Sequence, residues 1–478
     1  MKTNKRNKLE GCFSVYYPSF FIYIFVLILI NYYSVCGQNK PTTPQIPSIN
    51  YNIPNNGPVQ PNQQLNQYQN YFPTPSTNQN NPTYNFDQQD KNRQKYQEQI
   101  NREVSESRRK NNVSNDEYWR AAGFTEYTKP YYNALNNIKD MLTGKTSLSI
   151  KDAYYEIEKA AGNVYLSKSE YDEQINKSSN FIKRWLYENH YSLKDNMSLH
   201  FGLQKFMTDT LTISNKKNKE MPNPTPITHL GFYYDYQDYK AKKDERSYYV
   251  TKTFATGNGQ CHTLPIVYLI LAEQLGAKSY LSFAPIHSFI KYPDKKGKIH
   301  NFEVTSNWQI SDQWYIENFN IKSLAIKKGI YLNTMDRQQI VANAMLDLAC
   351  SYYKKYGIAD GSFIKQCVDF AMDYFPNKEA NILGWLLRYK TVSVKLNRIA
   401  KKHPEKTRED IEKMPEAKLL IAEYYSIEAE IESLGYETLP ESTYDRIVQN
   451  QDNKGKIQQL KQLDNLKKRN LFITTNTK

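Results

Sequence analysis

The chain has 478 residues, 40 of them tyrosine, and 63 Lys and Arg residues against 49 Asp and Glu residues give a formal net charge of +14. The basic residues are dispersed, without an arginine-rich run or a basic stripe interleaved with aromatic residues, which argues against a nucleic-acid-binding protein. We interpret the charge as a solvated surface with weak attraction to anionic envelope polymers. No Cys-x-x-Cys pair occurs and the histidines lack ligand spacing, so we expect no metal and no cofactor.

The first 37 residues have the pattern of a signal peptide. Basic residues between positions 2 and 8 precede a continuous apolar run, 20–30, and residues 35–37 suit cleavage before Gln38. An uncleaved signal anchor and a lipid-modified Cys36 are the alternatives. All three predict export of the remaining chain, to the periplasm, an anchored place in the cell envelope, or the medium, with membrane contact only through this segment.

Two further segments lack the pattern of a packed core. Residues 38–94 are rich in Pro, Asn and Gln and poor in aliphatic side chains, so we predict a disordered linker. Residues 451–478 form a Lys-rich tail, which we expect to be a solvated helix or a frayed end.

Helical patterning runs from about Asp90 to Ile213. The spacing of apolar residues predicts helices over 149–166, 170–187 and 196–213. After them, the aromatic segment 232–239 and the run 249–253 are predicted as strand and turn.

A glycine-rich turn then leads to a cysteine. Gly257-Asn258-Gly259-Gln260-Cys261 precedes an apolar segment, Leu264 to Leu275, that predicts a buried helix ended by Gly276. A thiol at a helix N-terminus is a candidate nucleophile, because orphan N–H groups and the helix dipole favour a thiolate. The alternative is that Cys261 is a small buried hydrophobic residue, as we expect for Cys350 and Cys367.

The candidate base and its orienting acid lie on two predicted strands. His287 belongs to a strand-like segment, 280–290, and Glu303 to the next one, 299–305, joined by a charged turn that predicts an antiparallel hairpin. The hairpin would bring Glu303 within reach of one imidazole nitrogen of His287. Asn301 and Asn307 are the alternatives to Glu303.

Two neighbours of Cys261 receive other assignments. We expect His262 to be a capping or surface group. Either Gln260 or one tyrosine of the 232–239 segment could bind the substrate carbonyl, although the backbone N–H of Cys261 is the more dependable oxyanion donor.

This order of Cys261, His287 and Glu303 on one helix and two strands resembles the transglutaminase-like branch of the papain-type cysteine enzymes. More narrowly, it looks like the exported Bacteroidetes type with tetratricopeptide-like helices behind the enzyme domain. The matching motifs are Gly259-Gln260-Cys261, His287 and Glu303-Val304-Thr305, where the family more often has Asp in place of Glu303. The resemblance covers roughly the middle third of the chain. It implies an α+β fold, with helices packed on a small antiparallel sheet.

Export affects the cysteine argument. If Cys12 and Cys36 leave with the signal, three cysteines remain, so at least one thiol is free. A free thiol in an oxidising compartment is usually selected against, which favours a working nucleophile at Cys261. Cys350 and Cys367 could form a bridge across a helical hairpin.

The pattern becomes wholly helical from about Asp336. Its helix–turn–helix form and aromatic and alanine spacing predict a tetratricopeptide-like region over 336–450, which we expect to pack against the enzyme domain because one degenerate unit rarely stands alone. The full predicted layout is a signal or anchor (1–37), a linker (38–94), a transglutaminase-like domain (95–335, its catalytic part about 225–335), the helical region (336–450) and the tail (451–478).

The leading functional hypothesis is an exported cysteine enzyme, a protease, amidase or acyltransferase, that cleaves or transfers an amide or peptide acyl group through a thioester on Cys261. The alternative is a catalytically inactive binding or scaffold protein of the cell envelope. The expected partners are a peptide or protein substrate and, on the helical repeats, a second protein.

Overall fold

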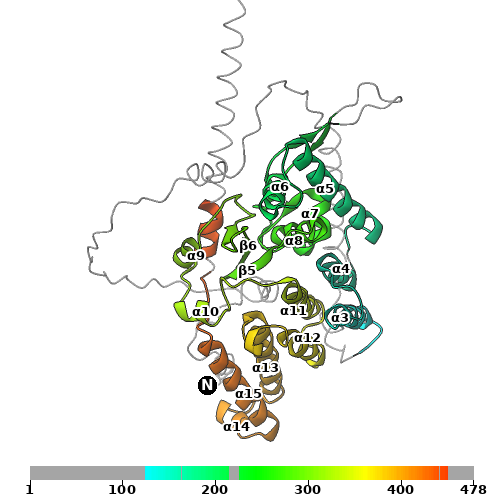
Figure 1. The fold of residues 1–478 in the computed structure, drawn as a ribbon. Helices are drawn as coiled ribbons and strands as arrows, with labels where there is room; N and C mark the ends of the chain where they lie inside the picture. The colour runs from blue at the N-terminus through cyan, green and yellow to red at the C-terminus, as the bar shows by residue number, and fades with distance from the viewer. Residues whose placement is uncertain (1–123, 163, 215–225, 441, 451–478) are drawn as a thin grey trace, which may run out of the picture.

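The computed structural model describes residues 124–162, 164–214, 226–440 and 442–450 (Figure 1). The predicted signal or anchor, the Pro-rich linker and the Lys-rich tail lie outside these residues. Within the described ranges, no helix has both the length and the apolar character needed to cross a membrane.

The described residues are rich in helix and hold three small sheets, an arrangement compatible with the predicted α+β class. The helices are α3 (Lys129–Leu142), α4 (Ile150–Ala161), α5 (Lys168–Glu188), α6 (Asn196–Thr208), η4 (Glu245–Tyr248), α7 (Val250–Thr256), α8 (Thr263–Leu275), α9 (Asp312–Phe319), α10 (Ser323–Lys327), α11 (Arg337–Tyr356), α12 (Ser362–Met372), η5 (Pro376–Lys378), α13 (Ile382–Lys402), α14 (Arg408–Glu412) and α15 (Pro415–Ser433). The strands are β1 (Leu211–Ile213), β2 (Ile227–His229), β3 (Tyr233–Tyr234), β4 (Asn258–Gly259), β5 (Tyr280–Ala284), β6 (His287–Pro293) and β7 (Ile299–Phe302).

The three helices predicted before residue 213 are present as α4, α5 and α6. Ser149 caps α4 by accepting a hydrogen bond from the Asp152 N–H at 3.3 Å. The first helix was predicted too long, because α4 ends at Ala161. The third was also predicted too long, because α6 ends at Thr208 and residues 211–213 form β1. That segment instead pairs antiparallel with β2, and its side chains add to the core beside α5.

The strand predicted over 249–253 is wrong, because α7 begins at Val250 and Tyr249 is its N-cap residue. The start of α7 is capped by a residue that is remote in sequence. The buried carboxylate of Glu158 accepts hydrogen bonds from the backbone N–H groups of Val250 and Thr251, at 2.6 and 3.3 Å. Gly257, with φ of 72°, ends the helix in the left-handed conformation and begins the nucleophile turn.

Helix α8 lies at the centre of the fold, as predicted from its apolar run. It is buried on nearly every side because α4, α5, α6, α7 and the β5–β6 hairpin all pack against it (Figure 1). Gly276 ends it with φ of 75°, which confirms the predicted stop.

The main sheet has the order β5-β6-β7 and is antiparallel throughout. The predicted β6–β7 hairpin is confirmed, with Ile290 opposite Phe302. The predicted strand 299–305 was too long, because β7 ends at Phe302, one residue before Glu303. The predicted segment 280–290 is divided into two strands, β5 and β6. Pro285 and Ile286 form the tight turn between β5 and β6, where Ile286 has φ of 52°. A second sheet pairs β3 with β4 in parallel, which brings the aromatic segment 232–239 alongside the nucleophile turn.

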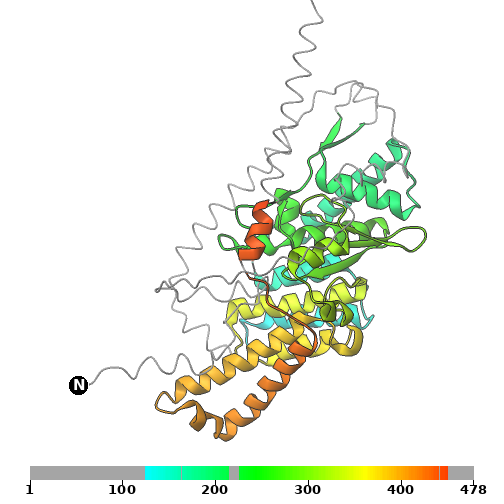
Figure 2. The same cartoon turned by 90° about the vertical axis from the view of Figure 1, so that its left-hand side faces the viewer.

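One continuous hydrophobic core extends from Tyr131 on α3 to Val448 near the end of the described chain. Helix α11 packs against α3, α4 and α12, so the helical region shares the core of the preceding part, as expected. A smaller cluster holds α13, α14 and α15 together. These three helices form a lobe that projects from the lower end of the molecule (Figures 1 and 2).

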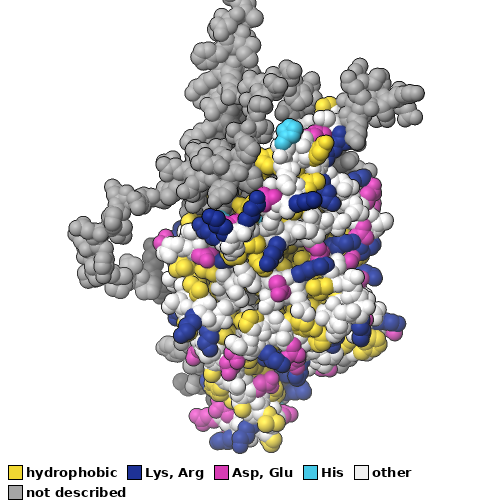
Figure 3. Space-filling model, in the orientation of Figure 1, with side chains coloured by type: hydrophobic (Ala, Val, Ile, Leu, Met, Phe, Trp, Pro, Cys, Tyr) yellow, Lys and Arg dark blue, Asp and Glu magenta, His cyan; other side chains and the backbone are white. Residues whose placement is uncertain are grey.

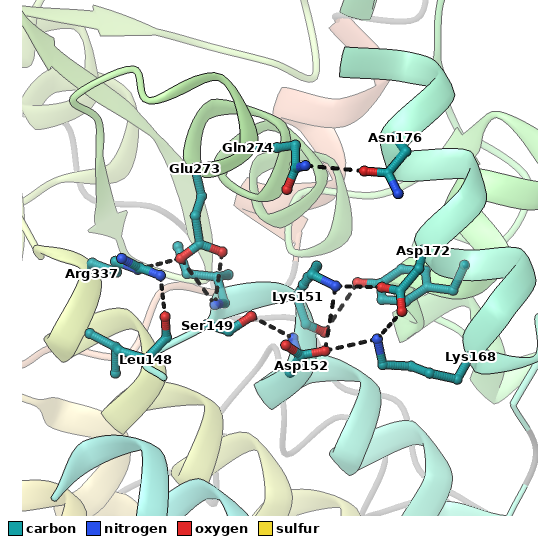
Figure 4. Close-up of polar contacts among 12 residues, drawn as sticks. Leu148, Ser149, Lys151, Asp152, Lys168, Asp172, Asn176, Glu273, Gln274 and Arg337 are labelled. Atoms are coloured by element: carbon teal, nitrogen blue, oxygen red, sulfur yellow. Dashed lines mark hydrogen bonds and ion pairs between the residues drawn. The ribbon is translucent and has the colours of Figure 1, made fainter. Parts of the chain in front are cut away.

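A polar network joins four helices at their ends (Figure 4). Glu273 on α8 accepts the Ile150 N–H at the start of α4, at 3.1 Å, and pairs with Arg337 at the start of α11. Lys151 on α4 contacts Asp172 on α5 at 2.5 Å. These contacts connect the starts of α4 and α11 to the end of α8.

The surface carries charges of both signs. Figure 3 shows Lys and Arg side chains interspersed with Asp and Glu over the face in view. This mixture is what a solvated surface requires.

Candidate active site

Cys261 lies just before α8, in a turn whose close packing requires glycine at position 259. A Cβ added to Gly259 would meet Thr263 Oγ1 at 2.8 Å and the Leu264 side chain at 2.9 Å. The same Thr263 hydroxyl accepts the Gln260 N–H at 3.1 Å, which anchors the turn on the first helical residue. The Cys261 side chain is 3% exposed. Its sulfur therefore sits beside the N-terminus of a helix, within the interior.

Three groups surround the sulfur of Cys261. The Tyr444 hydroxyl donates a hydrogen bond to Sγ at 3.1 Å. The thiol can itself donate to Gln260 Oε1, at 3.4 Å, or to the carbonyl oxygen of Ile286, at 4.0 Å. Strand β6 is tied to the same turn, because Ser288 Oγ donates to the Cys261 carbonyl at 2.5 Å. The nucleophile turn and the β5–β6 hairpin are thus held together directly.

The hairpin brings His287 and Glu303 together. His287 Nε2 lies 2.6 Å from Glu303 Oε2, and both side chains are buried. The other ring nitrogen, Nδ1, is buried and has no hydrogen-bond partner among the described residues. The thiol of Cys261 is nevertheless close enough to contribute to the raised pKa of His287. The imidazole therefore lies between the carboxylate and the sulfur.

The Glu303 carboxylate accepts three hydrogen bonds besides its contact with His287. Oε1 accepts from the Thr305 N–H at 3.0 Å and the Thr305 hydroxyl at 2.6 Å, and Oε2 accepts from the Tyr315 hydroxyl at 2.7 Å. In the acid-x-Thr motif, Thr305 thus orients the carboxylate of Glu303 towards His287. Glutamate in place of aspartate is accommodated by this arrangement.

Burial and charge act in opposite directions on this pair. Burial disfavours the imidazolium of His287, but the adjacent Glu303 carboxylate outweighs it and raises the pKa of His287 to about 10. Burial likewise disfavours the ionised Glu303, yet the imidazolium and the three donors bring the pKa of Glu303 below its ordinary value. At neutral pH the two groups form a buried ion pair.

The other predicted candidates lie apart from this arrangement. Asn301 donates to Asp312 at 2.8 Å, away from His287, and Asn307 sits in a turn with φ of 60°. Gln260 is buried beside Cys261, where its Oε1 accepts the His262 N–H at 2.8 Å. Its Nε2 has no partner among the described residues. Gln260 therefore presents a spare N–H donor close to the sulfur.

His262 is a buried residue, so the expectation of a surface group is wrong. It occupies the N-cap position of α8 but makes no side-chain capping bond. Its Nε2 lies 3.7 Å from Asp347 Oδ2 on α11, which also accepts from Tyr154 at 3.1 Å and Asn343 at 3.3 Å. Burial lowers the pKa of His262 to about 3 and raises the pKa of Asp347 to about 8. Both groups are neutral at pH 7, so their contact is not an ion pair.

The C-terminal part of the described chain covers the sulfur. Residues 442–450 are helical and lie against the half of the molecule that holds β5 and β6 (Figures 1 and 2). Besides its bond to Cys261, Tyr444 lies with its hydroxyl 3.4 Å from that of Tyr234 on β3. The next residue, Asp445, accepts from Tyr239 at 2.6 Å and pairs with Lys240 at 2.6 Å. Residues of the aromatic segment 232–239 thus form the surface against which this helix packs.

Sequence reasoning missed two of these residues. Tyr444 is 183 positions from Cys261, and no local pattern connects them. The sequence could have indicated Asp347, because it is the only charged residue in the mostly apolar run Ala342–Ala349. A charged group in a helix that is otherwise buried has to be paired or neutral.

A cavity of about 110 Å³ opens beside the sulfur. Cys261 and His287 line it from one side, and residues of α11, α13 and the 436–439 segment line it from the other. The groups that surround the thiol therefore also border a space that another molecule could enter.

The remaining described cysteines differ from Cys261. Cys350 and Cys367 are free and fully buried in the helical core, and burial raises the pKa of the Cys350 thiol well above its ordinary value. Among the residues that the structure describes, no group of three or more His, Cys, Asp or Glu side chains is arranged to hold a metal ion.

Comparison with known proteins adds no relative: no family model, no curated protein and no solved structure matches this chain.

Proposed function

We propose that the chain is an exported or envelope-tethered, transglutaminase-like cysteine enzyme that cleaves or transfers an amide or peptide acyl group. The observation that carries the proposal is the line of groups at the start of α8. Cys261 borders a cavity, His287 lies beside it with a spare ring nitrogen, and Glu303 holds the other ring nitrogen at 2.6 Å.

In the proposed reaction, the imidazolium of His287 already holds the proton at neutral pH, and the Cys261 sulfur attacks the substrate carbonyl as a thiolate beside it. The carbonyl oxygen becomes an oxyanion, toward which the spare N–H of Gln260 and the N-terminus of α8 would act as donors. When the C–N bond breaks, the imidazolium gives its proton to the leaving amine and a thioester remains on Cys261. Water or a second amine then attacks the thioester with His287 as base, which gives hydrolysis or transfer.

The raised pKa of His287 suits the first of these steps. With the pKa at about 10, the imidazolium is present at neutral pH before the attack and can stabilise a thiolate next to it. Glu303 would keep the ring oriented and charged, as a third residue does in other nucleophile–base pairs.

The first test is the rate of alkylation of each cysteine by iodoacetamide at pH 7, followed by peptide mass spectrometry. We expect Cys261 to react at least about tenfold faster than Cys350 and Cys367, since a paired thiolate outreacts buried thiols. Turnover of a peptide-amide library should be lost in Cys261→Ala and retained in the matched variant Cys367→Ala. Equal alkylation of the three thiols would remove the basis of the proposal.

One observation favours the second candidate, an inactive binding or scaffold protein. The Tyr444 hydroxyl contacts the sulfur at 3.1 Å, and only 3% of Cys261 is exposed. Under the enzyme proposal this cover has to move when substrate binds, which is common for segments that close over active sites.

Two substitutions of the same residue separate the candidates. Tyr444→Ala removes the ring and should raise the alkylation rate of Cys261 by about tenfold, because the sulfur becomes accessible. Tyr444→Phe keeps the ring and should change the rate by much less. A thiol that stays unreactive even in Tyr444→Ala would favour the binding protein.

A further inference from the structure

The cavity beside Cys261 has two chemically different parts. Its larger part is apolar, with walls from the β5–β6 hairpin, from α13 and from the segment after α15. These walls are made by Phe283, Ile286, Tyr331, Ile382, Leu386 and Leu439. A side chain that lies along them has to present an apolar stem.

The other part is a buried polar group on α11. Asn381, the cap of α13, donates to Asn343 Oδ1 at 3.1 Å, and Asn343 donates to Asp347 Oδ2 at 3.3 Å. These three side chains and His262 all line the cavity. The chain of hydrogen bonds therefore ends at the Asp347 carboxyl group, on the cavity wall.

Asp347 is left with one unused oxygen. Its side chain is 3% exposed, and Oδ1 has no hydrogen-bond partner among the described residues, although Oδ2 is shared by Tyr154 and Asn343. A buried polar atom without a partner destabilises the fold unless a ligand or water satisfies it. Burial keeps Asp347 protonated at pH 7. Its carboxyl group can therefore donate a hydrogen bond to an acceptor within the cavity.

The volume of the cavity limits the size of its occupant. A dry protein cavity of about 150 Å³ accommodates benzene, which has six heavy atoms. The cavity beside Cys261, at about 110 Å³, should take a group of four or five heavy atoms. This is the size of a single medium-length amino-acid side chain.

We propose that this cavity, termed here the acyl-side pocket, binds the side chain of the residue whose carbonyl is attacked by Cys261, and that it selects an uncharged side chain with an apolar stem and a terminal carboxamide. The stem lies against the apolar walls, and the carboxamide oxygen accepts the hydrogen bond that Asp347 offers. A carboxylate at the same place would be a buried charge next to the carboxyl groups of Asp347 and Glu437, which both line the cavity. An ammonium group could pair with Asp347 only if Asp347 gave up its proton, whereas a carboxamide accepts the hydrogen bond that the protonated acid already offers. The inference rests on the proposed function, since the pocket has this role only if Cys261 forms the thioester.

The test uses peptidyl acyloxymethyl ketones, in which the Cys261 sulfur bonds to the methylene carbon and the acyloxy group leaves as a carboxylate. Three probes differ only in the residue before the ketone, which is glutamine, methionine or glutamate. These side chains are similar in length but end in a carboxamide, a thioether or a charge. We expect the glutamine probe to label Cys261 about 10- to 100-fold faster than the other two, the range set by one buried hydrogen bond.

Two variants locate the discrimination within the pocket. Asp347→Leu should abolish the preference of glutamine over methionine. Leu386→Trp should slow all three probes by filling the apolar part. The matched control is Leu419→Trp, because Leu419 is an exposed residue on α15 and its replacement should leave every rate unchanged. Circular dichroism spectra show whether each variant has folded, and the ranking of the probes on the wild-type chain needs no variant.

Iodoacetamide separates the two ways in which the experiment can fail, because this small reagent does not require the pocket. Rapid alkylation of Cys261 with no discrimination among the three probes would overturn the pocket and leave the proposed function standing. Slow alkylation, equal to that of Cys350, would overturn the proposed function itself. A preference for the glutamate or methionine probe would also contradict the pocket, since Asp347 would then not be the selecting group.

Discussion

Two buried histidine–carboxylate pairs flank Cys261, and they carry opposite charge states. His287 and Glu303 form an ion pair, with the pKa of the histidine raised to about 10 and that of the acid lowered. His262 and Asp347 are both neutral at pH 7, with pKa values of about 3 and about 8. All four side chains are buried, so burial alone does not explain the difference.

The difference follows from distance and from the supply of donors. Nε2 of His287 lies 2.6 Å from its acid, whereas that of His262 lies 3.7 Å away, beyond a hydrogen bond. Glu303 also accepts three further hydrogen bonds, one of them from a backbone N–H, while Asp347 accepts two from neutral side chains. A buried charge persists only where such bonds replace the lost water.

The two pairs are therefore suited to different roles beside the same sulfur. The charged pair is suited to proton transfer, because its imidazolium can form and persist. The neutral pair is suited to binding, because a protonated carboxyl group can donate to an uncharged ligand.

Breaking the charged pair should have the largest effect. In Glu303→Gln, burial is no longer opposed by a carboxylate, so the pKa of His287 should fall below its ordinary value. We expect turnover to drop by about 10²- to 10⁴-fold and the free energy of unfolding to fall by about 3 kcal/mol. Steady-state kinetics and urea denaturation measure the two effects.

The matched control is Glu317→Gln, which changes an exposed acid on α9. It should leave both quantities nearly unchanged. If Glu303→Gln kept full activity, Glu303 would not be the orienting acid.

Removing a single donor should have a smaller effect. Tyr315→Phe deletes the 2.7 Å hydrogen bond to Glu303 Oε2, so the pKa of Glu303 should rise towards its ordinary value. We expect a loss of about 1.5–3 kcal/mol in the free energy of unfolding, as for hydrogen bonds to charged groups, and a several-fold loss of turnover. Tyr356→Phe is the control, because Tyr356 donates at the same 2.7 Å to a neutral carbonyl, that of Tyr127. Equal losses in the two variants would mean that the charge on Glu303 adds nothing.

In the other pair we expect a gain of stability that depends on pH, in place of a loss. Asp347 keeps its proton in the folded chain up to about pH 8, while in the unfolded chain it ionises near 3.8. The wild-type chain therefore loses stability as the pH rises from about 4 to 8, a loss that Asp347→Asn lacks. Urea denaturation at several pH values should show the variant gaining on the wild type across this window.

The opposite slope applies to Glu303, whose lowered pKa adds stability above about pH 4.5 that is lost as the pH falls. His287 contributes stability that is complete below about pH 6.5 and is lost as the pH rises towards 10. A stability difference between Asp347→Asn and the wild type that does not vary with pH would show that Asp347 is already ionised in the folded chain.

Much of the local structure around Cys261 could be predicted from the sequence. The apolar run with Gly276 behind it predicted α8, and the charged turn predicted the β6–β7 hairpin, because both depend on residues close in the chain. The run 249–253 was misassigned for the same reason. Its β-branched residues favour a strand locally, but the carboxylate of Glu158, about 90 positions earlier, caps a helix there.

The sequence by itself determined the order and spacing of a thiol, an imidazole and a carboxylate, and the elements that carry them. Only the tertiary structure decided that Tyr444 covers the thiol and that Asp347 ends its hydrogen-bond network in the cavity wall. The reason is physical: backbone propensity and apolar periodicity act over a few residues, whereas the charge of a buried group depends on neighbours brought from anywhere in the chain.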